Sequence, residues 1–144
     1  MRDAEPHRLL PDANLFVAAV RHRGRETDSL RLLARLAEDQ RYELIGDRYL
    51  VEEYQRYALA FHSLTAAGLL SSVLEKMRVV RPHDRFIAAC LPFLPTEELA
   101  DLIHAAACLE TGAALISNDR HFDRIASAGL IQRFTLSEAI EALL

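Results

Sequence analysis

The sequence predicts an α/β fold in which helices pack on a mostly parallel central sheet. Short apolar runs alternate along the chain with stretches whose apolar residues recur at helical spacing. This alternation is typical of parallel sheets joined by crossover helices. The chain has 144 residues, of which 51% are hydrophobic, which is enough for one core. We therefore expect residues 1–144 to form a single domain.

The charge balance does not by itself favour a nucleic-acid partner. The formal net charge is −4, and Lys76 is the only lysine among 17 basic residues, so the others are arginines. Arginine suits forked contacts to phosphate, although a compositional bias of the source genome explains the excess as well. An acidic metal site would also make a nuclease acidic overall while its bound cation accepts a phosphodiester.

The sequence favours a soluble, cytoplasmic protein with no membrane contact. No apolar run is long enough to span a bilayer, and residues 1–6 lack a basic segment followed by an apolar one. Cys90 and Cys108 each lie within apolar sequence and are far apart. We expect reduced core thiols rather than a disulfide or a metal clip.

The first predicted strand, residues 8–12, is a short apolar run that closes on Asp12. Asn14 is expected to be the N-cap of the helix that follows, and Pro11 to end the strand's hydrogen-bond ladder. An acid at the end of a strand that faces a helix N-terminus lies where ligands bind in open parallel sheets. Asp12 as a plain turn residue remains the alternative.

The middle of the chain predicts a strand over residues 43–46 and two helices, the first capped by Asp47. Within that helix, Glu53 lies at the edge of the apolar face, whereas Glu52 points away from it. We therefore expect Glu53, and not Glu52, to reach a partly enclosed site. The proline-rich residues 81–95 are expected to form an irregular crossing with a single helical turn.

A predicted helix over residues 99–110 carries the next acid. Its main apolar face begins with Leu99 and Leu102, and its second face brings Asp101 next to His104 with no other charge between residues 98 and 110. Asp101 is therefore expected to be enclosed, and an enclosed carboxylate must be paired, hydrogen-bonded or bound to a metal. An arginine or amide partner and a metal both remain open at this point.

The helix is followed at once by a buried strand and a further acid. Gly112 stops the helix, and residues 113–116 form a short apolar run that delivers Asp119 at its carboxyl end. A short helix over residues 121–128, an edge strand over residues 131–134 and a last helix opened by a capping box complete the predicted fold.

The predicted topology brings four acids to one edge of the sheet. Asp12 and Asp119 follow strands, while Glu53 and Asp101 lie near the starts of helices that lean over the same edge. Carboxylates that converge without a lysine cannot all stay ionised unless a cation joins them. Mg²⁺ or Mn²⁺ is the expected ion, and the chemistry of such a site is phosphodiester hydrolysis.

These acidic segments resemble, in order and context, the motifs of PIN-domain ribonucleases, including VapC-type toxins. The resemblance spans residues 8–135 and is carried by Leu10–Asn14, Glu53–Tyr54, Asp101–Ala107 and Ile116–Phe122. It implies a three-layer α/β/α sandwich and an Mg²⁺- or Mn²⁺-dependent endoribonuclease acting on RNA. It also implies frequent homodimerisation and, for toxin members, neutralisation by a small antitoxin protein.

The resemblance also implies roles for individual residues. By position, the catalytic and metal-binding quartet is formed by Asp12, Glu53, Asp101 and Asp119. Asn14 and Ser117 match auxiliary polar positions of the family. Asp123 is a candidate auxiliary acid, with capping or solvation of its own short helix as the alternative.

Other classes of protein fit the sequence less well. A receiver domain needs a lysine near its last strands, and a haloacid-dehalogenase-like phosphatase needs an aspartate where Asn14 stands. The remaining rival is a catalytically weak PIN-fold module that binds RNA or a protein partner. Metal-dependent cleavage of RNA distinguishes this module from the nuclease.

Overall fold

Five parallel strands form the central sheet, in the spatial order β3-β2-β1-β4-β5. The computed structural model describes residues 7–22, 24–94 and 98–144. Residues 1–6, and the end of the predicted 81–95 crossing, lie outside this part. The strands are β1 (His7–Pro11), β2 (Tyr42–Gly46), β3 (Arg78–Val79), β4 (Ala114–Ile116) and β5 (Arg133–Phe134).

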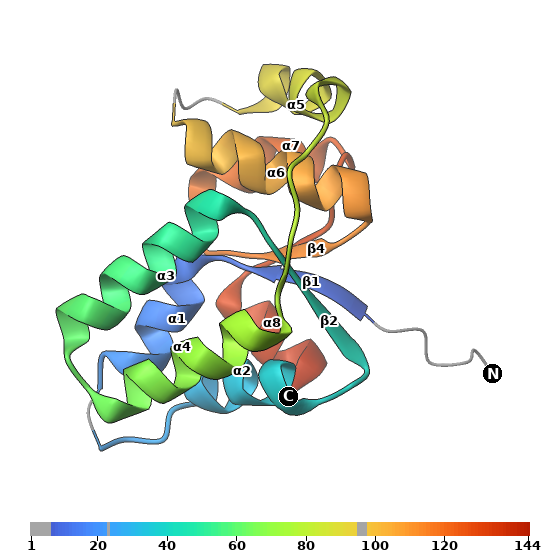
Figure 1. The fold of residues 1–144 in the computed structure, drawn as a ribbon. Helices are drawn as coiled ribbons and strands as arrows, with labels where there is room; N and C mark the ends of the chain where they lie inside the picture. Colours follow the sequence, from blue (N-terminus) through green and yellow to red (C-terminus); the bar gives the residue numbers. More distant parts are fainter. Residues whose placement is uncertain (1–6, 23, 95–97) are drawn as a thin grey trace.

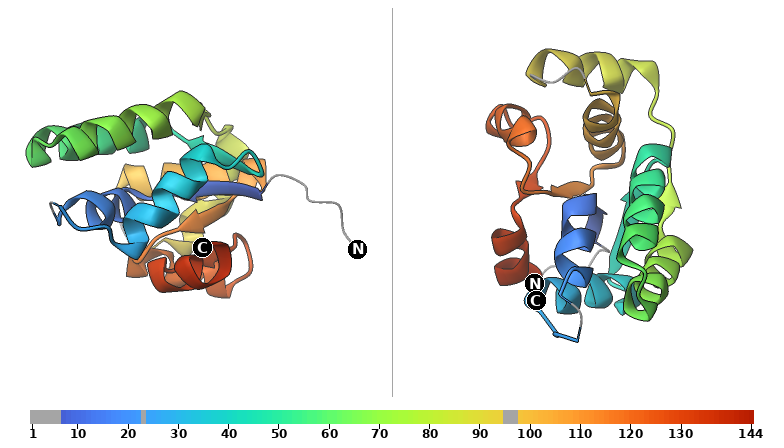
Figure 2. Two further views of the ribbon diagram at one scale, coloured as in Figure 1. Left: turned by 90° about the horizontal axis from the view of Figure 1, so that it is seen from below. Right: turned by 90° about the vertical axis from the view of Figure 1, so that its left-hand side faces the viewer.

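Helices cover both faces of this sheet, which confirms the predicted three-layer α/β/α fold. Figure 1 shows α5, α6 and α7 on one side of the sheet and α1 to α4 with α8 on the other, and Figure 2 gives the same layers from two further directions. The helices are α1 (Ala13–Val20), α2 (Asp28–Glu38), α3 (Arg48–Phe61), α4 (Leu64–Lys76), α5 (Asp84–Cys90), α6 (Leu99–Thr111), α7 (Asp123–Ser127) and α8 (Leu136–Leu143), with 3₁₀ turns η1 (Leu91–Phe93) and η2 (Arg120–Phe122).

The chain changes direction across the sheet between β1 and β4. Strands β1, β2 and β3 succeed one another toward one edge, and β4 then pairs with the opposite side of β1. The carboxyl ends of β1 and β4 therefore form the switch point at which parallel sheets bind ligands. Pro11 is the last residue of β1, opposite Ile116, as its missing N–H predicts.

Helix α1 begins two residues earlier than the sequence suggested. Its N-cap is Asp12, whose side chain accepts from the Ala13 backbone N–H at 2.8 Å. The prediction that Asn14 caps this helix is therefore wrong. The strand ends at Pro11 and Asp12 is the first residue after it, so the carboxylate reaches the free amide before Asn14 does.

The prolines of the 81–95 segment bound a helix rather than prevent one. Helix α5 runs for two turns between Pro82 and the turn η1, which contains Pro92. The prediction of a single helical turn was too short because the proline-free stretch between these residues is long enough for a helix.

Helix α6 is buried on its second face and at Ala106 and Ala107 of its main apolar face, whereas the start of the main apolar face is exposed. Leu99 is 51% exposed, whereas Asp101, His104, Ala105 and Cys108 are buried. Alanine and cysteine side chains are small, so this face comes closer to the sheet than a leucine face would. The enclosure predicted for Asp101 is confirmed, and so are the predicted free, buried thiols of Cys90 and Cys108.

None of the helices in the described part of the chain is long and apolar enough to cross a membrane.

Candidate active site

The four predicted acids line one cavity at the switch point of the sheet. The cavity has a volume of about 500 Å³, and its walls include Asp12, Glu53, Asp101 and Asp119. Asp12 follows β1 directly, and Asp119 lies three residues after the end of β4. Helices α3 and α6 contribute Glu53 and Asp101 from the two layers on either side of the sheet.

Both oxygens of Asp12 are held by neighbouring groups. One caps α1, and the other accepts a 2.6 Å hydrogen bond from the Ser117 hydroxyl. Burial raises the pKa of Asp12 above its usual value, and the charge of His104 and these hydrogen bonds oppose that effect. The carboxylate is thus fixed in place but poorly solvated.

Asn14 lies beside this carboxylate with one oxygen unused. Its amide nitrogen donates to the Ser117 hydroxyl at 3.3 Å and lies 3.5 Å from Asp12. Its side-chain oxygen is buried and has no hydrogen-bond partner within the described residues. A buried polar atom without a partner is unfavourable, so this oxygen indicates a site for a further ligand.

The two adjacent glutamates of α3 separate as their helical positions predict. The Glu53 side chain is 24% exposed and faces His104, whereas Glu52 is 60% exposed and lies 3.9 Å from Arg48. Both reach the cavity, but only Glu53 does so from the partly buried side of α3.

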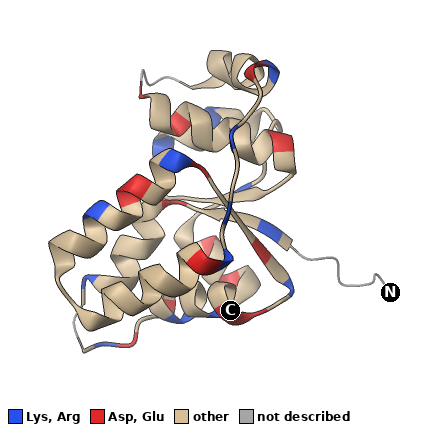
Figure 3. Cartoon of the chain, viewed as in Figure 1, with Lys and Arg blue, Asp and Glu red and all other residues tan. Residues whose placement is uncertain are grey.

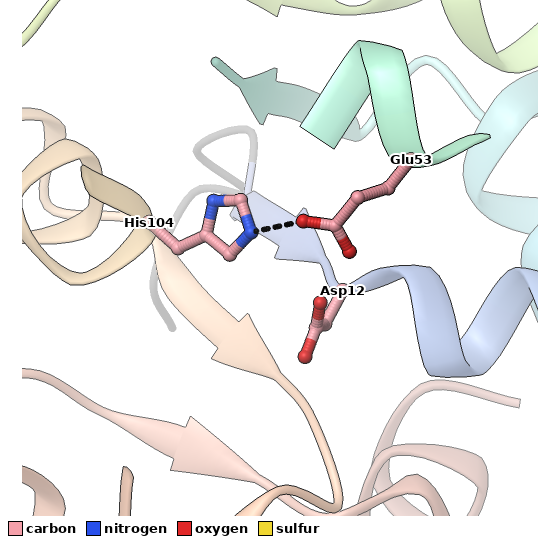
Figure 4. A group of neighbouring side chains, drawn as sticks. All are labelled: Asp12, Glu53 and His104. Atoms are coloured by element: carbon pink, nitrogen blue, oxygen red, sulfur yellow. Dashed lines mark hydrogen bonds and ion pairs between the residues drawn. The ribbon is translucent and has the colours of Figure 1, made fainter. Parts of the chain in front are cut away.

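His104 of α6 lies between two acids and was not identified as a site residue from the sequence. Its Nδ1 is 2.6 Å from Asp47 Oδ2 and its Nε2 is 3.3 Å from Glu53 Oε1. Burial would lower the pKa of His104, but the hydrogen bonds to these two carboxylates outweigh burial and raise it to about 10. Figure 4 shows Nε2 directed at one Glu53 oxygen, with the other oxygen on the side of Asp12.

His121 was also missed, and it connects the other two acids. Its Nδ1 lies 2.8 Å from Asp101 and 3.3 Å from Asp119, and its backbone N–H donates to Asp119 at 2.9 Å. Burial raises the pKa of Asp101, and the hydrogen bond with His121 opposes part of that rise. The arginine partner that the sequence left open for Asp101 is not found within the described residues.

The candidate auxiliary residues divide into two groups. Ser117 and Asn14 both lie against Asp12, where the family resemblance places them. Asp123 is not among the residues that line the cavity; it opens α7, is 57% exposed and pairs with Arg133. The structure therefore places Asp123 in the alternative role, on the surface of its own helix.

The donor atoms around the cavity fit a hard divalent cation. Within the described residues, no lysine or arginine side chain pairs with a carboxylate of the quartet, and Arg133 contacts Asp119 only at its backbone carbonyl. Ligand atoms of Asp12, Glu53 and His104 lie within 4.8 Å of one another, and so do those of Glu98, Asp101 and His121. Clustered carboxylate oxygens and an unused amide oxygen are the groups that Mg²⁺ and Mn²⁺ prefer.

The order and geometry of these acids agree with the comparison with known families. A family model described as the PIN domain matches residues 9–128, which include the whole quartet. The chain belongs to the PIN domain family. This finding confirms the resemblance seen in the four acidic segments. No curated protein matches the sequence significantly.

Solved structures similar to this PIN domain include two VapBC proteins. VapBC-1 from nontypeable Haemophilus influenzae is 15% identical with a TM-score of 0.58, and the match covers 90% of this chain and 98% of that chain. VapBC2 from Rickettsia felis, bound to a DNA fragment from their promoter, is 15% identical with a TM-score of 0.60, covering 89% and 98%. At this identity the likeness concerns the fold.

Proposed function

We propose that this PIN domain is an Mg²⁺- or Mn²⁺-dependent endoribonuclease and the toxin of a toxin–antitoxin pair. The observation that carries the proposal is the convergence of Asp12, Glu53, Asp101 and Asp119 on one cavity, where the basic side chains found in contact with their carboxylates among the described residues are two histidines, His104 and His121. Such a cluster is costly for folding unless a cation neutralises it. PIN domains are generally metal-dependent nucleases, and the cluster gives this chain the residues for that chemistry.

The quartet would hold the cation, and its neighbours keep the carboxylates in place. The chemistry supplied by bound Mg²⁺ or Mn²⁺ is a lowered pKa for an attacking water and neutralisation of phosphate charge. Ser117 and the α1 amide hold Asp12, and His121 holds Asp101 near Asp119. These contacts keep the carboxylate oxygens of Asp12 and Asp101 directed at the cavity and prevent the side chains from rotating into solvent.

The rim of the cavity has groups suited to single-stranded RNA. Arg56, Tyr49 and Tyr57 line it, and the Arg56 guanidinium lies 5.4 Å from the centre of the Tyr57 ring. Figure 3 shows that the acidic stretch of α3 is flanked by basic positions on the same helix. Arginine binds phosphate and tyrosine faces stack on bases, so the rim can hold RNA beside the acids.

We also propose two protein partners. The similarity to VapBC structures supports a small antitoxin as a partner of this chain. The apolar segment from Phe86 to Leu94, in which Leu91 is 57% exposed, supports a homodimer formed through α5 and η1.

The decisive experiment is cleavage of single-stranded RNA by the purified chain with Mg²⁺, with Mn²⁺ and with chelator. Wild type is expected to cleave only with metal, and Asp12→Asn is expected to be inactive because one ligand charge is lost while size is kept. Cleavage in chelator, or full activity of Asp12→Asn in excess Mg²⁺, would contradict the mechanism. RNA binding without cleavage under any metal would leave the binding-module alternative.

A further inference from the structure

The buried histidine of α6 links the cap of α3 to the acid that α3 carries into the cavity. His104 is 1% exposed and contacts Asp47 with one ring nitrogen and Glu53 with the other. Each contact atom on the acids is a carboxylate oxygen, which accepts hydrogen bonds. The geometry therefore has His104 donating from both nitrogens.

His104 does not touch substrate in this arrangement. Its side chain is buried and is not among the described residues that line the cavity, although Glu53 and Asp12 are. Of the two acids that accept hydrogen bonds from His104, only Glu53 lines the cavity, so these hydrogen bonds can affect the reaction only through Glu53.

The contact with Glu53 is not needed to build α3. Asp47 caps the helix with Oδ1 alone, which accepts from the Tyr49 and Leu50 amides at 3.0 Å each. The Glu53 side chain is 24% exposed, so water could satisfy it without the imidazole. The bond from Nε2 nevertheless holds one particular oxygen, Oε1, toward α6 and leaves Oε2 for the side of Asp12 (Figure 4).

We propose that His104 is a positioning residue, anchored by Asp47, which fixes the Glu53 carboxylate in the rotamer that offers its second oxygen to the cation. The inference rests on the proposed function only in taking a divalent cation as the ligand of Glu53. Hydrogen-bond donors that orient a metal-binding carboxylate typically change metal affinity about 10–100-fold when they are removed.

Two amide substitutions of His104 test separately its hydrogen bond to Asp47 and its hydrogen bond to Glu53. In His104→Gln the side-chain nitrogen reaches the position of Nε2, so the donor to Glu53 is kept and the Asp47 bond is lost. In His104→Asn the nitrogen lies near the position of Nδ1, so the Asp47 bond is kept and the donor to Glu53 is lost. Both variants remove the imidazole and any charge on it, so electrostatic repulsion of the cation cancels in the comparison.

The readout is Mn²⁺ binding by titration calorimetry on the full chain. We expect His104→Gln to bind Mn²⁺ within ~3-fold of wild type and His104→Asn to bind ~10-fold or more weakly. Equal affinities for the two variants, or weaker binding by His104→Gln, would overturn the positioning role while wild-type binding upholds the proposed metal site. If wild type itself binds no Mn²⁺, both this inference and the proposed function fail.

A third variant distinguishes orientation of Glu53 from direct ligation of the cation by His104, and serves if His104→Gln does not fold. In Asp47→Asn the Oδ1 cap remains, and the new amide donates to Nδ1, which leaves the hydrogen on Nε2. A positioning histidine still donates to Glu53, so Mn²⁺ affinity should stay within ~3-fold of wild type. A ligating histidine would lose its free Nε2 lone pair, so a ~10-fold loss in Asp47→Asn would overturn the proposal.

Discussion

Asp12 shows how one residue serves both the fold and the site. One oxygen begins α1 and the other accepts from Ser117, so the carboxylate cannot turn toward solvent. Burial nevertheless raises its pKa, which means that the ionised form is disfavoured in the metal-free protein. Stability and the proposed activity therefore oppose each other at this position.

We predict that Asp12→Asn makes the metal-free protein more stable, by about 1 kcal/mol. Asparagine keeps an oxygen for the Ala13 amide, while the buried charge is removed. The measurement is thermal and urea unfolding in chelator at neutral pH. If Asp12→Asn is less stable than wild type in chelator, the buried charge of Asp12 does not destabilise the metal-free protein.

Added Mn²⁺ should reverse this ranking. Wild type gains stability as RT ln(1 + [L]/Kd), whereas a variant that has lost a ligand gains little. The control is to repeat the unfolding measurements on wild type and Asp12→Asn with Mn²⁺. If Mn²⁺ stabilises both proteins equally, Asp12 is not a metal ligand.

The neighbouring glutamates give a matched pair for activity. Glu53→Gln should lower RNA cleavage about tenfold or more, since Glu53 lies among the acids and against His104. Glu52→Gln should change it little, because Glu52 is 60% exposed beside Arg48. Initial rates at saturating Mg²⁺ test the pair, and the opposite ranking would contradict the assignment.

At the scale of elements, α3 is held on the sheet by a tyrosine next to Glu53. Tyr54 is fully buried, stacks on Phe16 with ring centres 4.9 Å apart and donates to the Pro11 carbonyl at 2.6 Å. This hydrogen bond gives the last carbonyl of β1 a donor and fixes the position of α3 relative to the end of β1, next to Asp12.

We predict that Tyr54→Phe lowers the free energy of unfolding by about 1–3 kcal/mol, because it leaves a buried carbonyl unpaired while the stacking ring remains. Urea unfolding measures the loss. Tyr57→Phe on the same helix is the control: Tyr57 is half-buried, its ring is kept, and its hydroxyl has no hydrogen bond among the described residues, so we expect stability to change by less than about 0.5 kcal/mol. Equal effects would show that the Pro11 bond contributes nothing.

The link between α6 and α3 also predicts a pH dependence. The pKa of His104 is raised from 6.5 to about 10, so the stability that the charged ring contributes is complete below about pH 6.5. It is lost as the pH rises toward 10. In chelator, the free energy of unfolding of wild type should therefore fall more between pH 7 and pH 10 than that of His104→Gln. Urea unfolding at the two pH values measures both. Equal losses would show that the charged His104 ring does not stabilise the fold.

The order of the elements and the acids themselves were predictable, but the start of α1, the length of α5 and the partners of the acids were not. Periodicity identified Glu53 and the enclosure of Asp101, since both follow from positions along one helix. His104 and His121 were missed because their roles depend on which residues face them, and Glu53 lies 51 positions from His104. The exposure of Leu99 at the start of α6 was not predicted, because periodicity alone does not show that the small residues of the second face pack closest to the sheet.

At the scale of the whole molecule, the fold class followed from alternation of strands and helices, and the family from the order of the acids. The oligomeric state is harder to predict from the sequence, because it depends on which apolar side chains stay exposed after the chain has folded. Leu91 is 57% exposed in the apolar segment that ends at Leu94, where a second copy could cover it.

We predict a homodimer that Leu91→Glu converts to monomer, since two buried charges would face each other across the two-fold axis. Light scattering over a range of concentrations gives the mass, and circular dichroism checks that the variant folds. Leu59→Glu is the control, at an exposed leucine on α3. A wild-type monomer at all concentrations would remove the prediction.

The position of the site between β1 and β4 determines when the acid cluster can assemble during synthesis of the chain. Its two strand-end acids, Asp12 and Asp119, are far apart in the sequence, because β2 and β3 are formed from the chain between β1 and β4. A ribosome releases residue 12 long before residue 119, and domains fold as their segments emerge. The nascent chain therefore carries no assembled acid cluster until Asp119 has left the exit tunnel, which delays any nuclease activity until well after the other three acids have emerged.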